Sequence, residues 1–532
     1  MEKEDLIRIE EYYLLGKRVN SFLQGYKQNL ALIGPPFSGK TYLVEYFLKN
    51  TQPTSKFLPL YIDLEYLNSV DFIYQVLSSL LLYFTKQKKG IPSFLNLDSL
   101  ILENQEIIPQ TIEKIKNTLN LLHSKEKPAW DWIAQILDKF IEETQQKIVF
   151  IMENFTSVKH FSKKILSDLA KYIALQKNIM FIFIAKRKRE AEEILSQELN
   201  LIFGNFEKIY LKNFSYTQAY TYLESKLGKK IEPSFKKFLI DITDGFPFYL
   251  EIVAQELAKS PKENIEFEDF VEKLSLLFSN RYSCVYQIFT EKVNFLRQNF
   301  KDTFLINPLL ILIASGYTRK KELFSLLRID NKNLNSKLSK LLELDILDKN
   351  GSFYFIPDKL FSLWISSVFK LKRELPLIFS EDTKKAIKNK LKEKFEETNQ
   401  AQKKDSFQRF LELLQLFKDD TIKTGKKLIS LPQIKRLRII PAHNKNMKFI
   451  IGEAKRYYLI LAFKEDIPEE TDILEFSNRC SYFRYKQPKK IFITLKKADI
   501  TTKVLAKEKR LNFWEKEDVN LLLRLYNKPL II

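Results

Sequence analysis

Eight consecutive residues near the N-terminus have the types and spacing needed to hold phosphate. The pattern GxxxxGK[ST] is matched in full by Gly34, Pro35, Pro36, Phe37, Ser38, Gly39, Lys40 and Thr41. The two glycines let the backbone curl, so that successive N–H groups point inward at phosphate oxygens. We expect Lys40, solvent-facing before a ligand arrives, to reach the β- and γ-phosphates, and the Thr41 hydroxyl to bind Mg²⁺. The segment predicts a nucleoside triphosphate site, with ATP and magnesium as ligands.

A hydrolytic site also needs an acid at the end of a neighbouring strand. The run from Lys147 is apolar up to Glu153, which is therefore the candidate magnesium ligand and catalytic acid. In the usual pattern an Asp holds magnesium and a following Glu polarises water, but here the second position is Asn154, which cannot accept a proton. Two outcomes follow: slow hydrolysis with Glu153 in both roles, which we favour, or tight binding with little hydrolysis. Asp63 is a second carboxylate for the site or, equally, a cap for the next helix.

A cluster of basic residues follows the fourth expected strand, where a γ-phosphate sensor would lie. It consists of Lys186, Arg187, Lys188 and Arg189. One of these could contact nucleotide or act on a neighbouring subunit. The alternative is an exposed basic start of a helix.

The elements that must position these residues alternate between short apolar runs and helical patterns. The expected strands are Leu30–Ile33, Leu58–Asp63, Ile148–Met152, Met180–Ala185 and Phe206–Leu211. The phosphate-binding segment lies between the first of these strands and a helix at Tyr42–Leu48, which adds a favourable field for anions. Such alternation predicts a parallel sheet with crossover helices.

The rest of the chain reads as helical modules followed by a second α/β region. A helical lid is broken by a turn at Asp244–Pro247, and residues Ile306–Asp358 read as three helices and a two-stranded wing, a winged helix-turn-helix. Strands return at Leu437–Ile440, Met447–Glu453, Tyr457–Phe463 and Lys490–Leu495. We therefore predict a multidomain α/β chain with five parts: an ATPase core over 1–212, a lid over 213–300, a winged helix over 301–370, a helical linker over 371–422 and a basic domain over 423–532.

The order of these features resembles the archaeal-type ATPases of the STAND class over about the first 370 residues. The resemblance is carried by the phosphate-binding loop, the strand ending in Glu153 and Asn154, the lid, the turn Gly245-Phe246-Pro247 and the segment Tyr354–Trp364. It implies that Pro247 lies near nucleotide and couples the lid to nucleotide state; an ordinary helix–helix turn is the alternative. Archaeal origin-recognition initiators are the second family considered, but their lid usually carries an arginine where this chain has Gly-Phe-Pro.

The winged helix offers residues that could contact DNA. Its second helix would turn Asn333, Ser336, Lys337 and Lys340 outward, opposite Leu334, Leu338 and Leu341. Lys349 lies in the wing tip and could contact a backbone phosphate. The alternative is that the winged helix packs within the chain and makes no contact with DNA.

The C-terminal region resembles restriction-endonuclease-like folds through its order of strands and Glu453-Ala454-Lys455. Such nucleases need an acid on one strand and Glu-x-Lys on the next, which together hold magnesium. Residues 438–441 carry no acid, and a shifted alignment that pairs Glu453 with Ala462-Phe463-Lys464 also lacks a ligand. We therefore predict an inactive nuclease-like domain retained for nucleic-acid binding, with basic candidates at Lys435, Arg436, Arg438, Lys455 and Arg456.

Composition favours a polyanionic partner. The formal net charge is +21, and about two thirds of the excess lies after Ser380. Such a field favours nucleic acid, and we expect double-stranded DNA, unless the charge is only a solvated lysine-rich surface. The chain has two cysteines and no recognisable signal peptide or membrane span, so we expect a cytoplasmic protein.

Three functions from different classes remain open. The favoured one is a slowly hydrolysing, nucleotide-dependent DNA-binding switch, with homo-oligomer formation possible. The second is an ATP-dependent nuclease of a defence or mobile-element system, and the third is a protein-binding signalling switch.

Overall fold

The computed structural model describes residues 8–51, 56–90, 96–161, 163–199, 206–261, 263–300, 304–375, 380–425, 427–442, 446–455, 457–483 and 488–531. Its contacts divide the chain into two compact units. The first unit extends to Phe214 and includes Phe246–Phe248, and the second comprises Ser215–Gly245 and the residues from Tyr249 onward.

A five-stranded parallel sheet forms the centre of the first unit. Its order is β2-β3-β4-β1-β5, with β1 at Leu30–Ile33, β2 at Phe57–Asp63, β3 at Lys147–Glu153, β4 at Ile179–Ala185 and β5 at Glu207–Tyr210. All four neighbouring pairs run parallel. The five predicted strands and the parallel sheet are confirmed. The runs of β1, β3 and β4 are buried almost throughout, as is typical of such sheets, whereas β5 at the edge buries only Ile209 of its four residues.

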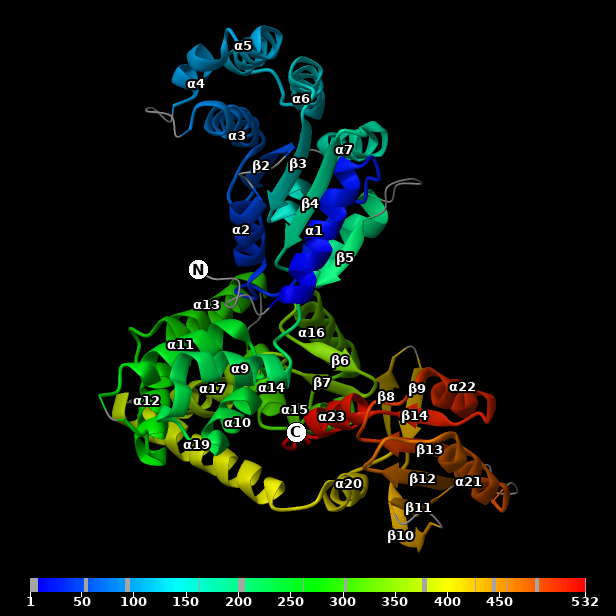
Figure 1. The fold of residues 1–532 in the computed structure, drawn as a ribbon. Helices are drawn as coiled ribbons and strands as arrows, with labels where there is room; N and C mark the ends of the chain where they lie inside the picture. The colour runs from blue at the N-terminus through cyan, green and yellow to red at the C-terminus, as the bar shows by residue number, and fades with distance from the viewer. Residues whose placement is uncertain are drawn as a thin grey trace. The chain divides into compact units, whose positions relative to one another are not determined.

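Helices cover both faces of this sheet (Figure 1). One face packs against α1 (Ile9–Leu23) and α2 (Lys40–Thr51), which bury residues such as Phe22 and Leu43 against alternate strand residues. The other face packs mainly against the helices between β2 and β4. These are α3 (Ser69–Lys89), α4 (Leu97–Asn104), α5 (Pro109–His123), α6 (Trp130–Thr144), the 3-10 helix Phe155–His160 and α7 (Lys163–Leu175). After β4 come α8 (Lys188–Glu193) and a π-helical turn at Ile194–Glu198.

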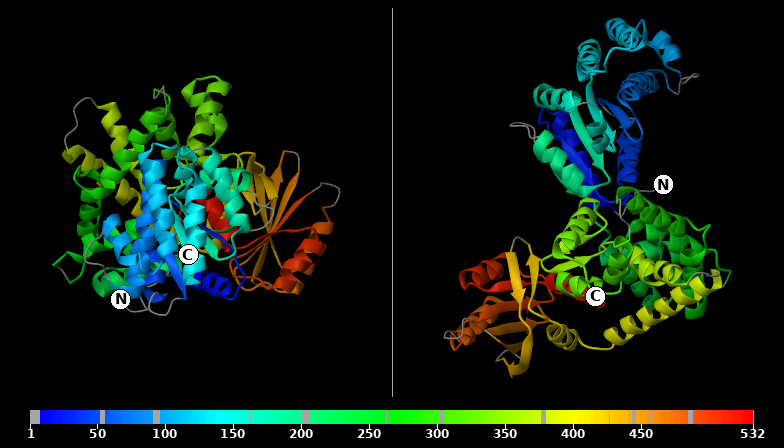
Figure 2. Two further views of the ribbon diagram at one scale, coloured as in Figure 1. Left: turned by 90° about the horizontal axis from the view of Figure 1, so that it is seen from above. Right: turned by 180° about the vertical axis from the view of Figure 1, so that it is seen from behind.

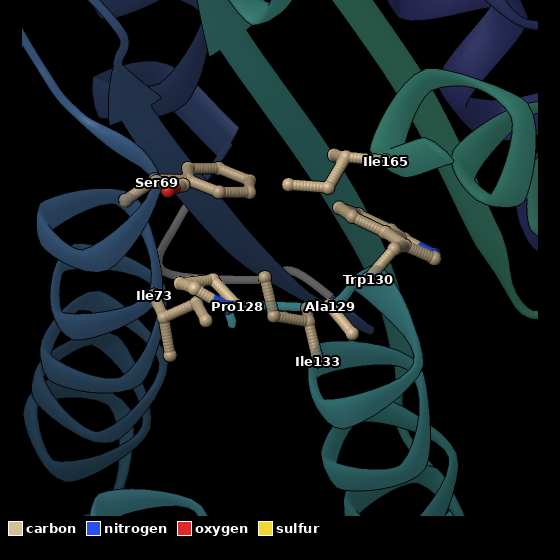
Figure 3. A pocket seen from close by; sticks show the side chains of 8 residues that line it. Ser69, Ile73, Pro128, Ala129, Trp130, Ile133 and Ile165 are labelled. Carbon is tan, nitrogen blue, oxygen red and sulfur yellow. The ribbon is translucent and has the colours of Figure 1, made fainter. Parts of the chain in front are cut away.

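Four of these helices, α3 to α6, lie between β2 and β3, where the sequence pattern had not distinguished them. Figure 3 shows a recess that α3 and α6 line together with α7: Ile73 comes from α3, Trp130 and Ile133 from α6, and Ile165 from α7. The recess that they line carries no charged side chain among its eight lining residues. It is hydrophobic packing rather than a ligand site.

The second unit begins with a group of helices. They are α9 (Tyr216–Leu227), a 3-10 turn at Gly228–Lys230, α10 (Pro233–Thr243), α11 (Pro247–Ala258), α12 (Phe267–Ser279) and α13 (Cys284–Asn299). The long helix α19 (Ser380–Gln402) packs on this group: Phe395 stacks on Phe267 of α12, and Lys388 pairs with Glu272.

Three helices and a hairpin follow in the order expected from the sequence. They are α14 (Ile306–Ala314), α15 (Lys320–Leu327), α16 (Asn331–Glu343), β6 (Asp348–Asn350) and β7 (Phe353–Phe355), and then α17 (Lys359–Trp364), a π-helical turn at Ile365–Phe369 and α18 (Lys370–Glu374). We call α14 to β7 the helix–hairpin segment.

A second sheet forms the C-terminal region, which Figure 2 shows from two further sides. Its order is β10-β11-β12-β13-β14, with β10 at Ile434–Pro441, β11 at Met447–Ala454, β12 at Tyr458–Lys464, β13 at Lys489–Thr494 and β14 at Asn512–Trp514. The first three strands are antiparallel, whereas β12, β13 and β14 are parallel. One face packs against α20 (Ser406–Gln415) and α23 (Lys516–Leu525), the other against α21 (Glu470–Ser481) and α22 (Ile500–Glu508).

A short hairpin that the sequence did not predict joins the helix–hairpin segment to the C-terminal region. It consists of β8 (Asp420–Thr424) and β9 (Lys427–Leu431). Phe353 of β7 belongs to the same hydrophobic core as the C-terminal sheet. Asp420, buried at 2% exposure, accepts hydrogen bonds from Arg319 and from the Tyr526 hydroxyl at 2.7 and 2.6 Å. These contacts make the two regions a continuous packed structure.

Candidate nucleotide site

The loop between β1 and α2 has the backbone expected of a phosphate-binding turn. A Cβ on Gly34 would lie 3.1 Å from the Leu211 carbonyl oxygen, and Gly39 has a φ of +86°. Phe37 also adopts a positive φ, of 64°, which is uncommon for a residue with a side chain. The glycines at both ends of the turn are therefore required by close approach and by backbone conformation.

Lys40 is buried rather than solvent-facing, so that expectation was wrong. Its side chain extends back along the loop, where Nζ donates to the carbonyl oxygens of Gly34 and Pro35 at 2.8 and 2.7 Å and lies 3.2 Å from the Ser38 hydroxyl. Burial lowers the pKa of Lys40 to about 8; the charge of Glu153 opposes this lowering, and the charges of Lys186 and Arg8 add to it by smaller amounts. The ammonium is thus held by groups that phosphate oxygens could replace.

Arg8 is a residue of this site that sequence reasoning missed. Its guanidinium donates to the Ser38 carbonyl oxygen at 2.7 Å and to the Lys212 carbonyl oxygen at 2.9 Å, and it pairs with Glu11 at 3.3 Å. It therefore ties the phosphate-binding loop to the segment after β5. No sequence signal marks it, because an arginine before an amphipathic helix is ordinary and its two acceptors are backbone atoms.

Glu153 lies where the sequence predicted, at the end of β3, and it faces the loop. Its Oε1 accepts a hydrogen bond from the Thr41 hydroxyl at 2.7 Å, and its Oε2 accepts one from the Tyr61 hydroxyl. Burial, and then the hydrogen bond to Glu153, raise the pKa of Tyr61. Both oxygens of this carboxylate are thus occupied, the second by a strand tyrosine that the motif pattern did not indicate.

Magnesium fits this arrangement. The Thr41 hydroxyl and the Glu153 carboxylate are oxygen ligands of the kind that Mg²⁺ binds, and phosphate oxygens and water usually complete its shell. Among the described residues no three His, Cys, Asp or Glu side chains are grouped as a metal cage.

A second polar network lies beside Glu153 at the ends of β2, β3 and β4. Asn154 has a left-handed backbone with φ 53°, and its Nδ2 donates to Asp63 Oδ1 at 2.6 Å and reaches Glu65 Oε2 at 3.5 Å. Lys186, the first residue after β4, donates to the same Glu65 oxygen at 2.7 Å. Asp63 does not cap α3, because the N-cap of that helix is Asn68.

The remaining basic residues after β4 begin a helix. Arg187 is the N-cap of α8 and lies 3.9 Å from Glu190. Lys188 lies over the ring of Tyr210. The charge of Lys186, one of the four sensor candidates, lowers the pKa of Lys40.

Pro247 opens α11, directly after Gly245 and Phe246. The three residues Phe246–Phe248 group with the first unit, although α10 and the rest of α11 from Tyr249 onward belong to the second. The ring of Phe248 stacks on Phe37 of the phosphate-binding loop, with centroids 4.5 Å apart. The turn therefore touches the loop through Phe248; a nucleotide contact by Pro247 stays a prediction.

The DNA candidates on α16 are less open than expected. Leu334, Leu338 and Leu341 are buried as predicted, and Ser336 is exposed. Asn333, Lys337 and Lys340 are half-buried. Lys337 lies over the Phe300 ring, and Lys340 pairs with Glu343 at 3.4 Å.

The tip of the β6–β7 hairpin is attached to β8. Asn350 exchanges two hydrogen bonds with the backbone of Lys423, at 3.0 and 2.6 Å, and Ser352 N donates to the Thr421 carbonyl oxygen at 2.9 Å. A Cβ on Gly351 would lie 1.9 Å from that same oxygen. The neighbouring Lys349 is exposed and lies over Tyr354. Most of the tip is therefore engaged within the second unit.

The basic residues of the C-terminal region do come together on β10 and the end of β11. Lys435, Arg436, Arg438 and Lys455 are exposed, and Arg436 lies opposite Glu453 in the antiparallel register. Arg438 pairs with Glu453 at 3.4 Å. Arg456 lies outside the described residues. β10 is an edge strand of its sheet, so this basic edge is accessible along its length.

The nuclease alternatives are not assembled. β10 places arginines beside Glu453, where the first alignment needs an acid. In the shifted alignment Lys464 is the register partner of Met447, six positions along β11 from Glu453, or roughly 20 Å for an extended strand. Lys464 is instead buried and paired with Asp472. The shifted alignment was therefore wrong, because β11 and β12 run in opposite directions.

None of the described helices has the length and apolar character needed to cross a membrane.

Comparisons with known proteins are limited to distant structural likeness. No family model matches the sequence. No curated protein matches it either. A Walker-type ATPase of Pyrococcus abyssi is similar in structure over 68% of this chain and 97% of that one, with 16% identity and a TM-score of 0.48. The ORC2 protein of Aeropyrum pernix covers 73% of this chain and 95% of its own, with 13% identity and a TM-score of 0.42. The ORC1 protein of Aeropyrum pernix, solved in complex with DNA, covers 69% and 94%, with 12% identity and a TM-score of 0.36. At these scores the likeness carries no inference about the ligands of this chain, whose phosphate-binding loop and parallel sheet stand on its own geometry.

Proposed function

We propose that this chain binds ATP with magnesium at Gly34–Thr41, hydrolyses it slowly, and uses nucleotide state to control binding of double-stranded DNA. The observation that carries the nucleotide part is the Thr41–Glu153 hydrogen bond of 2.7 Å. It brings the hydroxyl of the phosphate-binding loop and the strand-end acid to one point beside the buried Lys40.

Each residue has a defined part in this proposal. The loop N–H groups and Lys40 bind the phosphates, while Thr41 and Glu153 hold Mg²⁺. Bound magnesium would neutralise charge that develops on the β- and γ-phosphate oxygens. Arg8 keeps the loop in place through the Ser38 carbonyl oxygen. Hydrolysis is slow because the position after Glu153 is an amide.

DNA binding is assigned to the basic edge formed by β10 and the end of β11. Between Thr421 and Ile460 the sequence has ten Lys or Arg residues and one acid, Glu453. The α16 and hairpin-tip candidates contribute less, since Lys337 and Lys340 have contacts within the chain and the tip is bonded to β8. This favours the packing role for a winged helix, and a nuclease-like sheet that binds without cleaving.

The coupling is assigned to Gly245-Phe246-Pro247. This segment leads from α10 into α11, and its neighbour Phe248 stacks on Phe37. A change in the loop on nucleotide binding would therefore reach the start of α11 directly. A homo-oligomer of this chain is compatible with the proposed switch.

The experiment that tests the proposal measures DNA binding across a salt series, with and without ATP and Mg²⁺. We expect affinity that falls steeply with salt and shifts with ATP in the wild type, but does not shift with ATP in Lys40→Ala. Steady ATP turnover that is lost in Glu153→Gln would support hydrolysis. Absence of DNA binding at low salt would overturn the DNA part and favour the protein-binding switch. A magnesium-dependent nick in plasmid, lost in Glu453→Ala, would instead favour the nuclease.

A further inference from the structure

The position that ordinarily holds the water-activating base is turned away from that task in this chain. Asn154 follows the strand-end acid, and its left-handed backbone directs the amide to β2, where Nδ2 donates to Asp63 Oδ1 at 2.6 Å. A short amide–carboxylate contact fixes the position of both side chains. The residue that replaces the expected base therefore holds a carboxylate from the neighbouring strand.

Glu153 is poorly suited to serve in both roles. Its two carboxylate oxygens accept hydrogen bonds from Thr41 and Tyr61. Each of its two oxygens is therefore already engaged by a hydroxyl donor from a neighbouring element. Glu153 can hold magnesium in this arrangement, but another group has to receive a proton from water.

Asp63 is placed to receive it. It is the register partner of Glu153 in the parallel pair β2–β3, so the two side chains project from the same face of the sheet. That is the face covered by α1 and α2, since Ile151, two residues before Glu153, packs there. Both of its hydrogen bonds, from Asn154 and from Glu65 N, are made by Oδ1. Within the described residues nothing donates to Asp63 Oδ2.

Glu65, the other carboxylate of this network, is a weaker candidate. Its Oε2 pairs with Lys186 at 2.7 Å and is shared with the Asn154 amide. The oxygen that Glu65 turns toward this network is therefore already engaged by two donors.

We propose that Asp63 is the general base for ATP hydrolysis, moved from β3 to β2, and that Asn154 is its positioning residue. The water oxygen bonds to the γ-phosphorus as the bond from that phosphorus to the bridging oxygen breaks. The electron pair of the broken bond stays on ADP, and one water proton passes to Asp63, which then releases it to solvent. This inference rests on the proposed hydrolytic function of the same site.

The test is an exchange of the two side chains. Asp63→Asn is isosteric and keeps an acceptor for Glu65 N, so we expect ATP affinity within about twofold of wild type but a kcat about 100-fold lower. The double variant Asp63→Asn with Asn154→Asp keeps an amide–carboxylate pair and moves the carboxylate to β3. We expect the kcat of the double variant to be at least about tenfold higher than that of Asp63→Asn. Asp63→Ser is a second variant should Asp63→Asn fold poorly, and Asp71→Asn, an exposed acid on α3, is the control.

The outcomes separate this inference from the function on which it rests. Loss of kcat in Asp63→Asn with rescue in the double variant supports the proposal. If the wild type hydrolyses ATP and the kcat of Asp63→Asn is within about threefold of the wild-type kcat, the role of Asp63 is overturned and the ATPase proposal stands. Loss without rescue also overturns the base assignment, because a structural role would give that result. Wild-type protein that binds ATP without turnover overturns both hydrolysis and the role of Asp63, while binding stands.

Discussion

Acidic residues and lysines lie at or next to strand ends in both sheets of this protein, but they have different roles in the two sheets. In the first sheet, strand ends and loops bring together Thr41, Tyr61, Asp63, Glu153 and Lys186. In the second, Glu453 and Lys464 also lie near the ends of the neighbouring strands β11 and β12, yet these two strand ends lie at opposite ends of the sheet. The difference is strand direction. The carboxyl ends of parallel strands lie at the same end of a sheet, whereas those of antiparallel strands alternate between its two ends. An acid and a lysine at strand ends predict a site only in the first case.

If Lys464 stabilises the second sheet and binds no ligand, removing its partner should destabilise the protein. Asp472→Ala tests this and has the largest expected effect. Their side chains are 4% and 2% exposed, and leaving one buried charge unpaired costs about 3–5 kcal/mol of the free energy of unfolding. Denaturant unfolding monitored in the C-terminal region measures it. The exposed pair Arg438–Glu453 is the matched control, because Glu453→Gln should change stability by less than about 0.5 kcal/mol. A change of similar size in both variants would contradict a structural role for the buried pair.

The same contrast requires Lys40 to be a ligand-binding lysine. Lys40→Ala removes charge-assisted hydrogen bonds to phosphate worth about 1.5–3 kcal/mol, which corresponds to roughly a 10- to 150-fold loss of ATP affinity. Calorimetric titration with ATP and Mg²⁺ measures it, with Lys49→Ala in the last turn of the same helix as the control. Wild-type affinity in Lys40→Ala would refute the site assignment.

The basic edge of the second sheet should act through charge rather than chemistry. Arg436→Gln and Arg438→Gln are each expected to weaken DNA binding several-fold and to reduce the slope of log affinity against log salt by roughly 1. Lys349→Gln, at the hairpin bonded to β8, is the contrasting variant and should change the slope less. Equal effects at the hairpin and at β10 would show that the edge is not the main contact.

The smallest expected effect is the pH dependence contributed by Lys27, a half-buried lysine of the first unit. Lys27 donates to the carbonyl oxygens of Ile173 and Gln176 at 2.8 and 2.6 Å, and burial lowers its pKa from 10.5 to about 8. The unfolded chain then binds more protons between these values, so the cost of burying this group is full below pH 8 and is relieved as pH rises toward 10.5.

The contribution of Lys27 to the free energy of unfolding should rise with pH across this window in the wild type. In Lys27→Met this contribution is absent, so the rise should be smaller by less than about 1 kcal/mol. Urea unfolding at pH 7 and pH 9.5 measures the difference. An identical pH dependence in the two proteins would contradict the lowered pKa.

Local pattern was enough to identify the nucleotide loop and most of the strands. Gly34, Gly39, Lys40 and Thr41 are marked by residue type and spacing, and β1, β3 and β4 by apolar runs that are buried almost throughout. The same applies to Glu153, which ends such a run. These features depend on residues adjacent in the chain, so local sequence is sufficient to predict them.

Tertiary structure decided which distant residues meet. Arg8 reaches Ser38 and Lys212 through backbone oxygens, and Tyr61 reaches Glu153 because β2 and β3 are neighbours in register; neither contact leaves a trace in residue type. Burial of Lys40 depends on the fold of its own loop, and the hairpin tip is engaged because β8 lies beside it. The antiparallel pairing of β11 and β12 separates Glu453 from Lys464. The spacing of two strands along the chain does not indicate whether they pair parallel or antiparallel, so the sequence did not predict this separation.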